Sequence, residues 1–192
     1  MKHKILRIFI LLLALPIKIL KPLRNTLKRI FFQVWAEGQL SGINPTVQFD
    51  GLVELKGKKI KFGNYARIGY SVQIETNENG SVEIEEEVRI NRGTTIVSYT
   101  NIKIGAYTMI GEFVSIRDAN HGIAPNEFIK KQPHDTKAIS IGKDCWIGRG
   151  ACILPGVTIG DGAVIGANSV VTKSIPNGAI AVGSPAKVIK NR

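Results

Sequence analysis

The chain has 192 residues, of which 44% are hydrophobic and 21% charged, values typical of a single folded globular domain. Its formal net charge is +11. Eight of the 26 Lys and Arg residues lie in residues 1–36, which contain no Asp or Glu. Residues 37–192 contain the other 18 basic residues and all 15 acidic residues. Because this larger part is nearly balanced in charge, its composition argues against a nucleic-acid-binding surface, and no nucleic-acid partner is expected.

The N-terminal part begins with a short apolar run. Residues 5–15 are apolar except for Arg7, and the run ends at Pro16. A helix needs about 20 apolar residues to cross a bilayer, so this run is too short, and no small-residue cleavage site of a signal peptide follows it. We therefore interpret residues 1–36 as a basic amphipathic helical segment that binds an anionic membrane surface, divided into short helices by Pro16 and Pro22. The alternative is a helical segment that caps its own domain or packs on a neighbouring subunit.

From about residue 60 onward, an aliphatic residue recurs at every sixth position. The longest uninterrupted series is Ile141, Ile147, Ile153, Ile159, Ile165 and Val171. Four residues after most of its members stands a small or β-branched residue: Cys145, Ala151, Val157, Ala163 and Ser169. A period of six fits neither a helix nor a continuous strand, but it is typical of short strands joined by tight corners in a solenoid.

The repeat predicts an all-β domain over residues 37–192, shaped as a triangular prism. Each aliphatic side chain points inward, the small residue fills the space near a corner, and Gly or Asn supplies the corner conformation. Three hexads complete one coil, and the hexads in the chain predict about five coils. Each inward aliphatic side chain contributes roughly 1.5–3 kcal/mol through burial.

The hexads resemble those of the hexapeptide-repeat acyltransferases, whose fold is a left-handed parallel β-helix. The resemblance covers about residues 60–190. It is closest to the galactoside and maltose O-acetyltransferases and to polysaccharide O-acetyltransferases, through the run I-S-I-G-K-D-C-W-I-G-R-G-A-C-I-L-P-G-V-T-I-G-D-G-A-V-I-G-A-N-S-V-V-T-K-S-I-P. This resemblance implies acetyl-CoA as the co-substrate, no metal, and a homotrimer in which each active site is shared between two subunits.

The longest interruption of the repeat is residues 117–140, which contain two of the three histidines of the chain, His121 and His134. Attack of an alcohol on a thioester requires a base to take the hydroxyl proton, and a histidine is suited to this role near neutral pH. His121 lies in D-A-N-H-G, where it is similar to the catalytic histidine of the family, and we predict that it is the general base. We expect His134 to be solvated or locally packed.

Two further loop residues are candidates for the active site. Asp118 and Asn120 could orient the imidazole of His121 or contact the acceptor, and either could equally be a turn residue. Asn91 lies two residues from the position where the resembling branch has an asparagine that faces the acceptor.

The resemblance also assigns residues that follow the loop. It implies that Trp146 lies beside the active site, although this tryptophan could also be a subunit contact. The positions that it implies for the coenzyme lining are Gly148, Ala167, Thr172 and Lys173. In the closing G-S-P-A-K-V-I-K, Lys187 and Lys190 match basic residues near the nucleotide phosphates; the alternative is a solvated C-terminal tail.

The acceptor is the least determined part of the prediction. Residues 1–50 do not match the helical sugar-binding portion of the galactoside and maltose branch, so neither free sugar is expected. We predict O-acetylation of a sugar hydroxyl in a ternary complex, in the biosynthesis of a surface polysaccharide or of a lipid-linked glycan, by a cytoplasmic protein bound peripherally to the inner face of the membrane.

The same prism supports several other functions. N-acetylation of a nucleotide-linked amino sugar, acetylation of a xenobiotic and a non-catalytic scaffold remain open, although the first family usually begins with a βαβ domain. Serine acetylation would require a large helical domain ahead of the prism. A zinc carbonic anhydrase on the same prism needs three histidine ligands, and the third histidine here is His3, in the N-terminal segment. Cys145 and Cys152 match no metal or disulfide pattern and are expected to be small apolar fillers in a reducing compartment.

Overall fold

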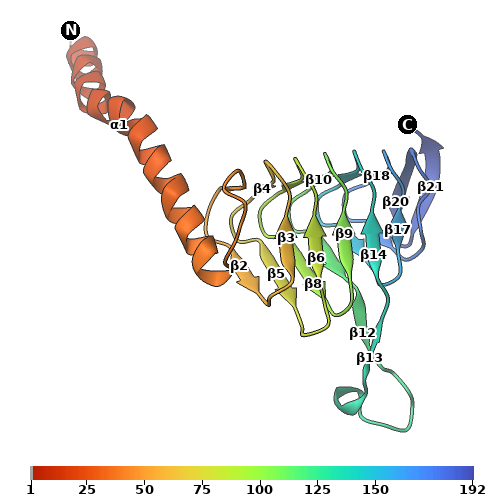
Figure 1. The fold of residues 1–192 in the computed structure, drawn as a ribbon. Coiled ribbons are helices and arrows are strands. Elements are labelled where there is room, and N and C mark those ends of the chain that lie inside the picture. The colour runs from red at the N-terminus through yellow and green to blue at the C-terminus, as the bar shows by residue number, and fades with distance from the viewer. Residues whose placement is uncertain (1) are drawn as a thin grey trace.

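A long helix precedes a solenoid of short parallel strands, and one hairpin stands out from the side of the solenoid (Figure 1). The structure is a computed structural model that describes the backbone of residues 2–192 and the side chains of residues 20–192. The side chains of Lys2, Lys4, Arg7 and Lys18, which belong to the predicted membrane-binding segment, lie outside the described residues. The helix, α1, spans Lys2–Gln39.

The strands form three sheets, which are the three faces of a prism. The first sheet contains, in spatial order, β1 (Gln48–Phe49), β4 (Arg67–Ile68), β7 (Arg89–Ile90), β10 (Met109–Ile110), β15 (Trp146–Ile147), β18 (Val164–Ile165), β20 (Ala179–Gly183) and the antiparallel β21 (Ala186–Asn191). The second contains β2 (Glu54–Lys56), β5 (Gln73–Thr76), β8 (Thr95–Ser98), β11 (Ser115–Arg117), β16 (Cys152–Ile153) and β19 (Val170–Val171). The third contains β3 (Ile60–Phe62), β6 (Val82–Ile84), β9 (Ile102–Ile104), β14 (Ile139–Ile141) and β17 (Thr158–Ile159).

The predicted prism is confirmed, but it has about seven turns instead of about five. The difference arises at both ends. The first turn begins at β1, before the start of the recognised repeat, and Phe49 and Leu55 already occupy buried inward positions there. At the other end, β20 adds a further strand to the first sheet after the last hexad.

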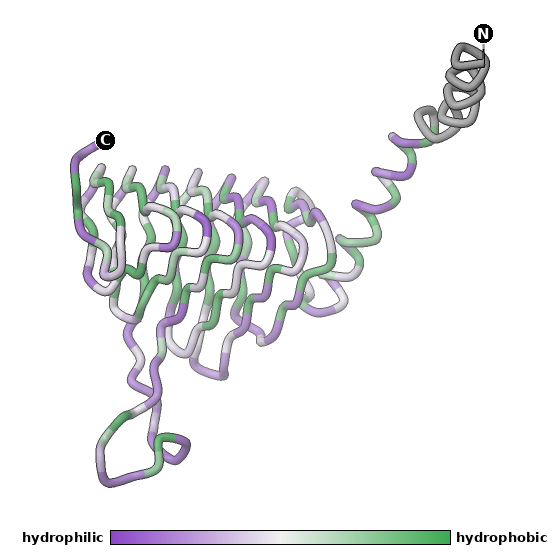
Figure 2. The backbone as a smooth tube through the Cα atoms, turned by 180° about the vertical axis from the view of Figure 1, so that it is seen from behind, coloured by the Kyte–Doolittle hydropathy of each residue, from purple (hydrophilic) through white to green (hydrophobic). Residues whose placement is uncertain are grey.

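Stacked isoleucine side chains fill the interior. In the first sheet, the parallel register places five isoleucines one above another: Ile68, Ile90, Ile110, Ile147 and Ile165. All five are buried. Hydrophobic and hydrophilic residues alternate along each turn (Figure 2), because successive side chains of a strand point to opposite faces.

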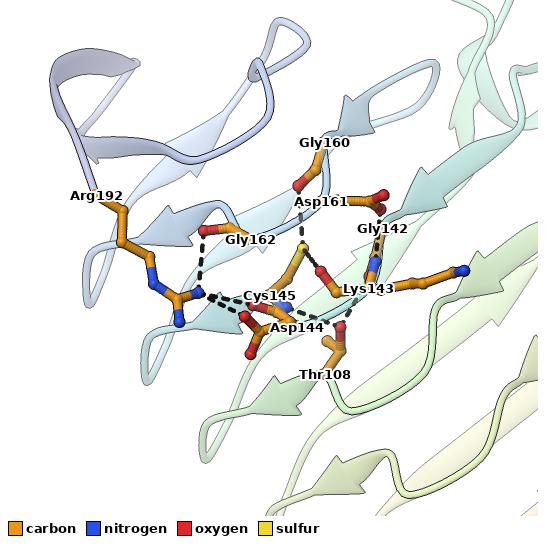
Figure 3. A network of polar contacts seen from close by, with 9 residues as sticks. All are labelled: Thr108, Gly142, Lys143, Asp144, Cys145, Gly160, Asp161, Gly162 and Arg192. Atoms are coloured by element: carbon orange, nitrogen blue, oxygen red, sulfur yellow. Dashed lines mark hydrogen bonds and ion pairs between the residues drawn. The ribbon is translucent and has the colours of Figure 1, made fainter.

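Small polar residues at the corners form hydrogen bonds between turns. At one buried corner, the Thr108 hydroxyl donates to the carbonyl oxygen of Gly142 at 2.8 Å and accepts from the backbone N–H of Cys145 at 3.1 Å (Figure 3). The Cys145 thiol donates to the carbonyl of Gly160 at 3.2 Å. Cys145 therefore fills a corner of the prism, as a small residue at that position was expected to do.

The C-terminal end of α1 packs on the first turn of the prism. The indole N–H of Trp35 and the amide nitrogen of Gln39 both donate to the carbonyl oxygen of Val53, each at 3.1 Å. The amide oxygen of Gln39 accepts from the backbone N–H of Leu55 at 2.9 Å, and Ala36 is fully buried. Residues 35–39 thus contact the first turn of the prism, and the predicted boundary after residue 36 lies within this docked end of the helix.

The prediction that prolines divide the N-terminal segment is wrong, because α1 is continuous from residue 2 to residue 39. A proline removes one backbone hydrogen bond and costs about 3 kcal/mol inside a helix. Here the flanking Leu, Ile, Lys and Arg residues favour the helix, and the docked C-terminal end fixes its last turns. Within the described residues, no helix combines the length and the apolar character that crossing a membrane requires.

Candidate active site

The predicted catalytic loop is an antiparallel hairpin at the corner between the second and third sheets. It leaves the prism after β11 and returns into β14, and it consists of β12 (Ala119–His121), the 3-10 helix Ile129–Lys131 and β13 (His134–Thr136). Figure 1 shows the hairpin projecting from the side of the prism. His121 and His134 are directly opposite each other in the hairpin register.

Three rings stack at the base of this hairpin. The ring centroids of His121 and His134 are 4.6 Å apart, and those of His134 and Tyr99 are 4.5 Å apart, with interplanar angles of 40° and 39°. These separations are typical of packed aromatic pairs. Both histidines are exposed. The stack therefore orients the imidazole of His121 while leaving it open to a substrate, and His134 is locally packed.

Asp118 is fully buried at the root of the hairpin. Its carboxylate accepts hydrogen bonds from the Ser98 hydroxyl at 2.7 Å, the Tyr99 backbone N–H at 2.6 Å and the Thr100 backbone N–H at 3.0 Å. These contacts occupy the carboxylate and tie the hairpin to the corner that carries Tyr99. Asp118 thus places the stack, and it does so without contacting the imidazole of His121.

The far end of the hairpin is held by a residue that sequence reasoning missed. Gln132 is buried, and its side-chain oxygen accepts from the backbone N–H of Ala124 at 2.7 Å. Its side-chain nitrogen donates to the carbonyls of Ala124 and Glu127 at 3.0 and 2.8 Å. Asn120 lies on the opposite face of β12 from His121, because side chains alternate along a strand.

The remaining candidates occupy two other parts of the prism. Thr172 and Lys173 follow β19 at the same corner as the hairpin, and both are exposed. Lys187 and Lys190 are exposed on β21, at the end of the first sheet. The side chain of Trp146 is 54% exposed on the outer face of the first sheet, in register between Met109 and Val164.

Asn91, Gly148 and Ala167 lie at the corner between the first and second sheets. A Cβ atom at Gly148 would lie 2.6 Å from the backbone nitrogen of Ala167 and 2.7 Å from the carbonyl oxygen of Ile165. Close approach of consecutive turns therefore requires glycine at position 148. One chain thus brings His121, Thr172 and Lys173 to one corner, and it places Asn91 and Ala167 at another.

Among the described residues, no cluster of His, Cys, Asp or Glu side chains could hold a metal ion.

The ion pairs of the prism lie on its surface. At the third corner, the ammonium of Lys103 hydrogen-bonds Glu85 at 2.8 Å and lowers the pKa of that carboxyl. A neighbouring pocket of about 470 Å³ is lined by residues that include Lys61 and Tyr107, and none of the predicted site residues lines it.

Comparison with known proteins identifies relatives of the chain. The family described as "Bacterial transferase hexapeptide (six repeats)" matches residues 138–173. The chain is 34% identical over 139 residues to the putative lipopolysaccharide biosynthesis O-acetyl transferase WbbJ of Escherichia coli, over 68% of this chain and 71% of that relative.

Two solved structures are similar to the chain. A galactoside acetyltransferase in complex with coenzyme A is 30% identical, with a TM-score of 0.50 over 74% of this chain and 65% of the other. An N-acyltransferase from Bacillus cereus, in complex with dTDP and coenzyme A, has a TM-score of 0.67 at 24% identity over 76% of this chain and 80% of the other, which supports the fold alone.

These findings confirm the family resemblance and the left-handed parallel β-helix that it implied. The relative from Escherichia coli is covered over more than two thirds of its length, and its name and that of the galactoside enzyme are those of acetyltransferases. The chain belongs to the hexapeptide-repeat transferase family and is an acyltransferase.

Proposed function

We propose that the protein transfers an acetyl group from acetyl-CoA to a sugar hydroxyl, in the biosynthesis of a surface polysaccharide or a lipid-linked glycan. The observation that carries this proposal is the exposed imidazole of His121, oriented by a ring stack on a hairpin at the edge of a hexapeptide prism. The names of the relatives support the reaction class and the sugar acceptor.

His121 is the general base of the proposed reaction. Its imidazole takes the proton of the acceptor hydroxyl as the hydroxyl oxygen attacks the thioester carbon, and it returns this proton to the departing coenzyme thiolate. The new ester bond and the broken thioester bond thus balance with no covalent enzyme intermediate. His134 and Tyr99 act as positioning residues that fix the imidazole plane.

Acetyl-CoA fits the exposed cations and polar groups of the C-terminal turns. We assign its nucleotide phosphates to Lys187 and Lys190 on β21, and we assign its binding surface to the exposed Thr172 and Lys173. Among the described residues, no ion pair joins Lys173, Lys187 or Lys190 to a carboxylate.

A homotrimer would complete the site. His121 and Thr172 lie at one corner of a protomer, whereas Asn91, Trp146 and Ala167 lie on another face and corner. A neighbouring subunit related by a closed three-fold axis can bring the second group to the first. Sedimentation of the full chain should give a trimer, and a fully active monomer would contradict this arrangement.

We further propose that α1 binds an anionic membrane surface. The side chains of Leu20, Leu23, Leu27, Ile30 and Val34 recur at helical spacing and are all about half exposed or more. Basic residues between them meet lipid headgroups in the manner of an interfacial helix. The name of the lipopolysaccharide-related relative is compatible with an acceptor at such a surface.

This proposal is tested with the variant Leu23→Glu/Leu27→Glu and with a protein that lacks residues 1–30. Both changes spare the contacts of Trp35 and Gln39 with the prism. Both proteins should stay folded and acetylate a soluble acceptor, and both should lose sedimentation with vesicles containing phosphatidylglycerol. Vesicle binding that is unchanged would show that α1 has a structural role only.

The test of the reaction is a screen of acceptor sugars and amino sugars with labelled acetyl-CoA, followed by His121→Ala. This substitution should lower kcat by about 10²–10⁴ and leave coenzyme affinity nearly unchanged. His134→Ala should lower kcat much less, because that ring only positions the base. Equal effects of the two substitutions, or product in which nitrogen carries the acetyl group, would overturn the proposal.

A further inference from the structure

Four exposed side chains form a continuous stack at the corner between the first and second sheets. We call Tyr70, Arg92, Phe113 and Arg149, which come from four successive turns, the arginine corner. The Cζ atom of Arg92 lies 5.8 Å from the ring centroid of Tyr70 and 5.5 Å from that of Phe113. The Cζ atom of Arg149 lies 5.6 Å from the same Phe113 ring. The two guanidinium groups therefore share one aromatic platform.

A glycine makes room for this platform. Gly93 has a φ of +66°, and a Cβ atom there would lie 2.5 Å from two atoms of the Phe113 ring. The missing side chain lets the ring lie against the backbone beside Arg92. That guanidinium also donates a hydrogen bond to the Tyr70 hydroxyl at 2.6 Å. The corner thus holds both the ring and one guanidinium in place.

The guanidinium groups of the arginine corner are exposed and form no ion pair with the side chains that the structure describes. Among the described residues, the ion pairs of the protein include neither Arg92 nor Arg149, whereas Arg67 pairs with Asp50 at 2.8 Å. Arg89 lies next to Arg67 in the register of the first sheet and is likewise outside these pairs. A solvated cation that is already oriented loses little freedom when it binds an anion.

The guanidinium groups of the arginine corner are suited to bind phosphate, and the aromatic rings beside them are suited to contact an apolar surface of the same ligand. A guanidinium presents parallel N–H groups that match two oxygens of a phosphate. Tyr70 and Phe113 are 46% and 50% exposed, and their rings offer flat surfaces to the non-polar face of a sugar or a carrier. The backbones of Arg92 and Arg149 are two turns apart, about 10 Å, and their guanidinium groups lie against the same Phe113 ring.

The arginine corner also adjoins residues assigned above to the reaction. Arg92 directly follows Asn91, the candidate that faces the acceptor, and Arg149 directly follows Gly148, a candidate for the coenzyme lining, on the same corner. We propose that the arginine corner binds a phosphate or diphosphate of the acceptor, so that the enzyme acetylates a sugar attached through phosphate to a carrier. This inference rests on the proposed function, and it names the chemical class of the acceptor.

Binding of inorganic pyrophosphate to the full-length protein tests the site without requiring turnover. Titration calorimetry should show that Arg92→Ala and Arg149→Ala each weaken pyrophosphate binding by about tenfold or more. The control Arg67→Ala, on the same sheet but paired with Asp50, should change it less than twofold. Phe113→Leu keeps both cations and removes the platform, and it should weaken binding to an intermediate extent.

Kinetics then connect the site with the acceptor. A sugar linked to a nucleoside diphosphate or to a polyprenyl diphosphate should be a better acceptor than the same free sugar, and whichever of the two is acetylated faster identifies the carrier. In Arg92→Ala, KM for that acceptor should rise about tenfold or more, whereas KM for acetyl-CoA should not change.

Several outcomes would overturn the inference. They are an effect on KM for acetyl-CoA alone, equal use of free and phosphate-linked sugars, unchanged pyrophosphate binding in both alanine variants, and a variant whose only defect is loss of the oligomer. Failure of the proposed function itself would appear differently, as an absence of acetyl transfer to every acceptor while pyrophosphate binding still depends on Arg92 and Arg149.

Discussion

Replacing Asp118 by alanine removes a buried acceptor on which the placement of the proposed catalytic hairpin depends. The carboxylate is fully buried and accepts from Ser98, Tyr99 and Thr100. In the variant, two backbone N–H groups and one hydroxyl lose their partner inside the protein. Each buried unsatisfied donor costs about 1–3 kcal/mol, and part of this is offset because a buried charge is no longer desolvated.

The expected loss of stability is about 3–5 kcal/mol. For a chain of this length, 1 kcal/mol corresponds to about 2–4 °C, so Tm should fall by about 6–20 °C. Ser98→Ala removes only one of the three donors and should cost about 1–2 kcal/mol. Asp135→Asn is the matched control, because Asp135 is exposed on the same hairpin and its one ion pair among the described side chains is with Lys137, at 3.4 Å. It should change stability by less than about 0.5 kcal/mol.

The assay is thermal unfolding at a single protein concentration, combined with amide hydrogen exchange. In Asp118→Ala, the amides of Tyr99 and Thr100 should lose protection before the strands of the prism core do. Activity should fall together with this protection, because Tyr99 supports the stack that orients His121. A variant that melts like the wild-type protein and keeps both amides protected would refute the assigned role of Asp118.

Two further predictions concern the prism itself. Ile147→Ala should destabilise the protein by about 2–5 kcal/mol in chemical denaturation, because this side chain is fully buried within a stacked column. Trp146→Ala, on the outer face of the same strand, should destabilise it much less. Equal losses of stability would contradict the assignment of inward and outward faces. Burial raises the pKa of the Cys145 thiol, which reduces its thiolate fraction near pH 8. Timed labelling with iodoacetamide and mass spectrometry should therefore find Cys145 unmodified while Cys152 reacts, and equal labelling rates would show that Cys145 is accessible.

The sequence alone determined the prism and the position of the hairpin. Inward side chains such as Ile147 and Ile153 recur at a fixed spacing because each face of the prism takes six residues, and this local period is visible without any contact between turns. The hairpin was visible as a long interruption of that period. His121 was selected because a histidine in such a loop has the acid–base chemistry that acyl transfer needs.

Only the tertiary structure decided which side chains meet. Tyr99 and Asp118 are separated by 19 residues and meet because one turn of the prism brings them together. The sequence did not show this partnership, since loops of unequal length shift the register between turns. For the same reason, the sequence did not predict the docking of Gln39 on Leu55 or the stack of Arg92 with Phe113. Each of these contacts joins different turns or elements, so its partners follow from how the turns stack and not from local sequence preference.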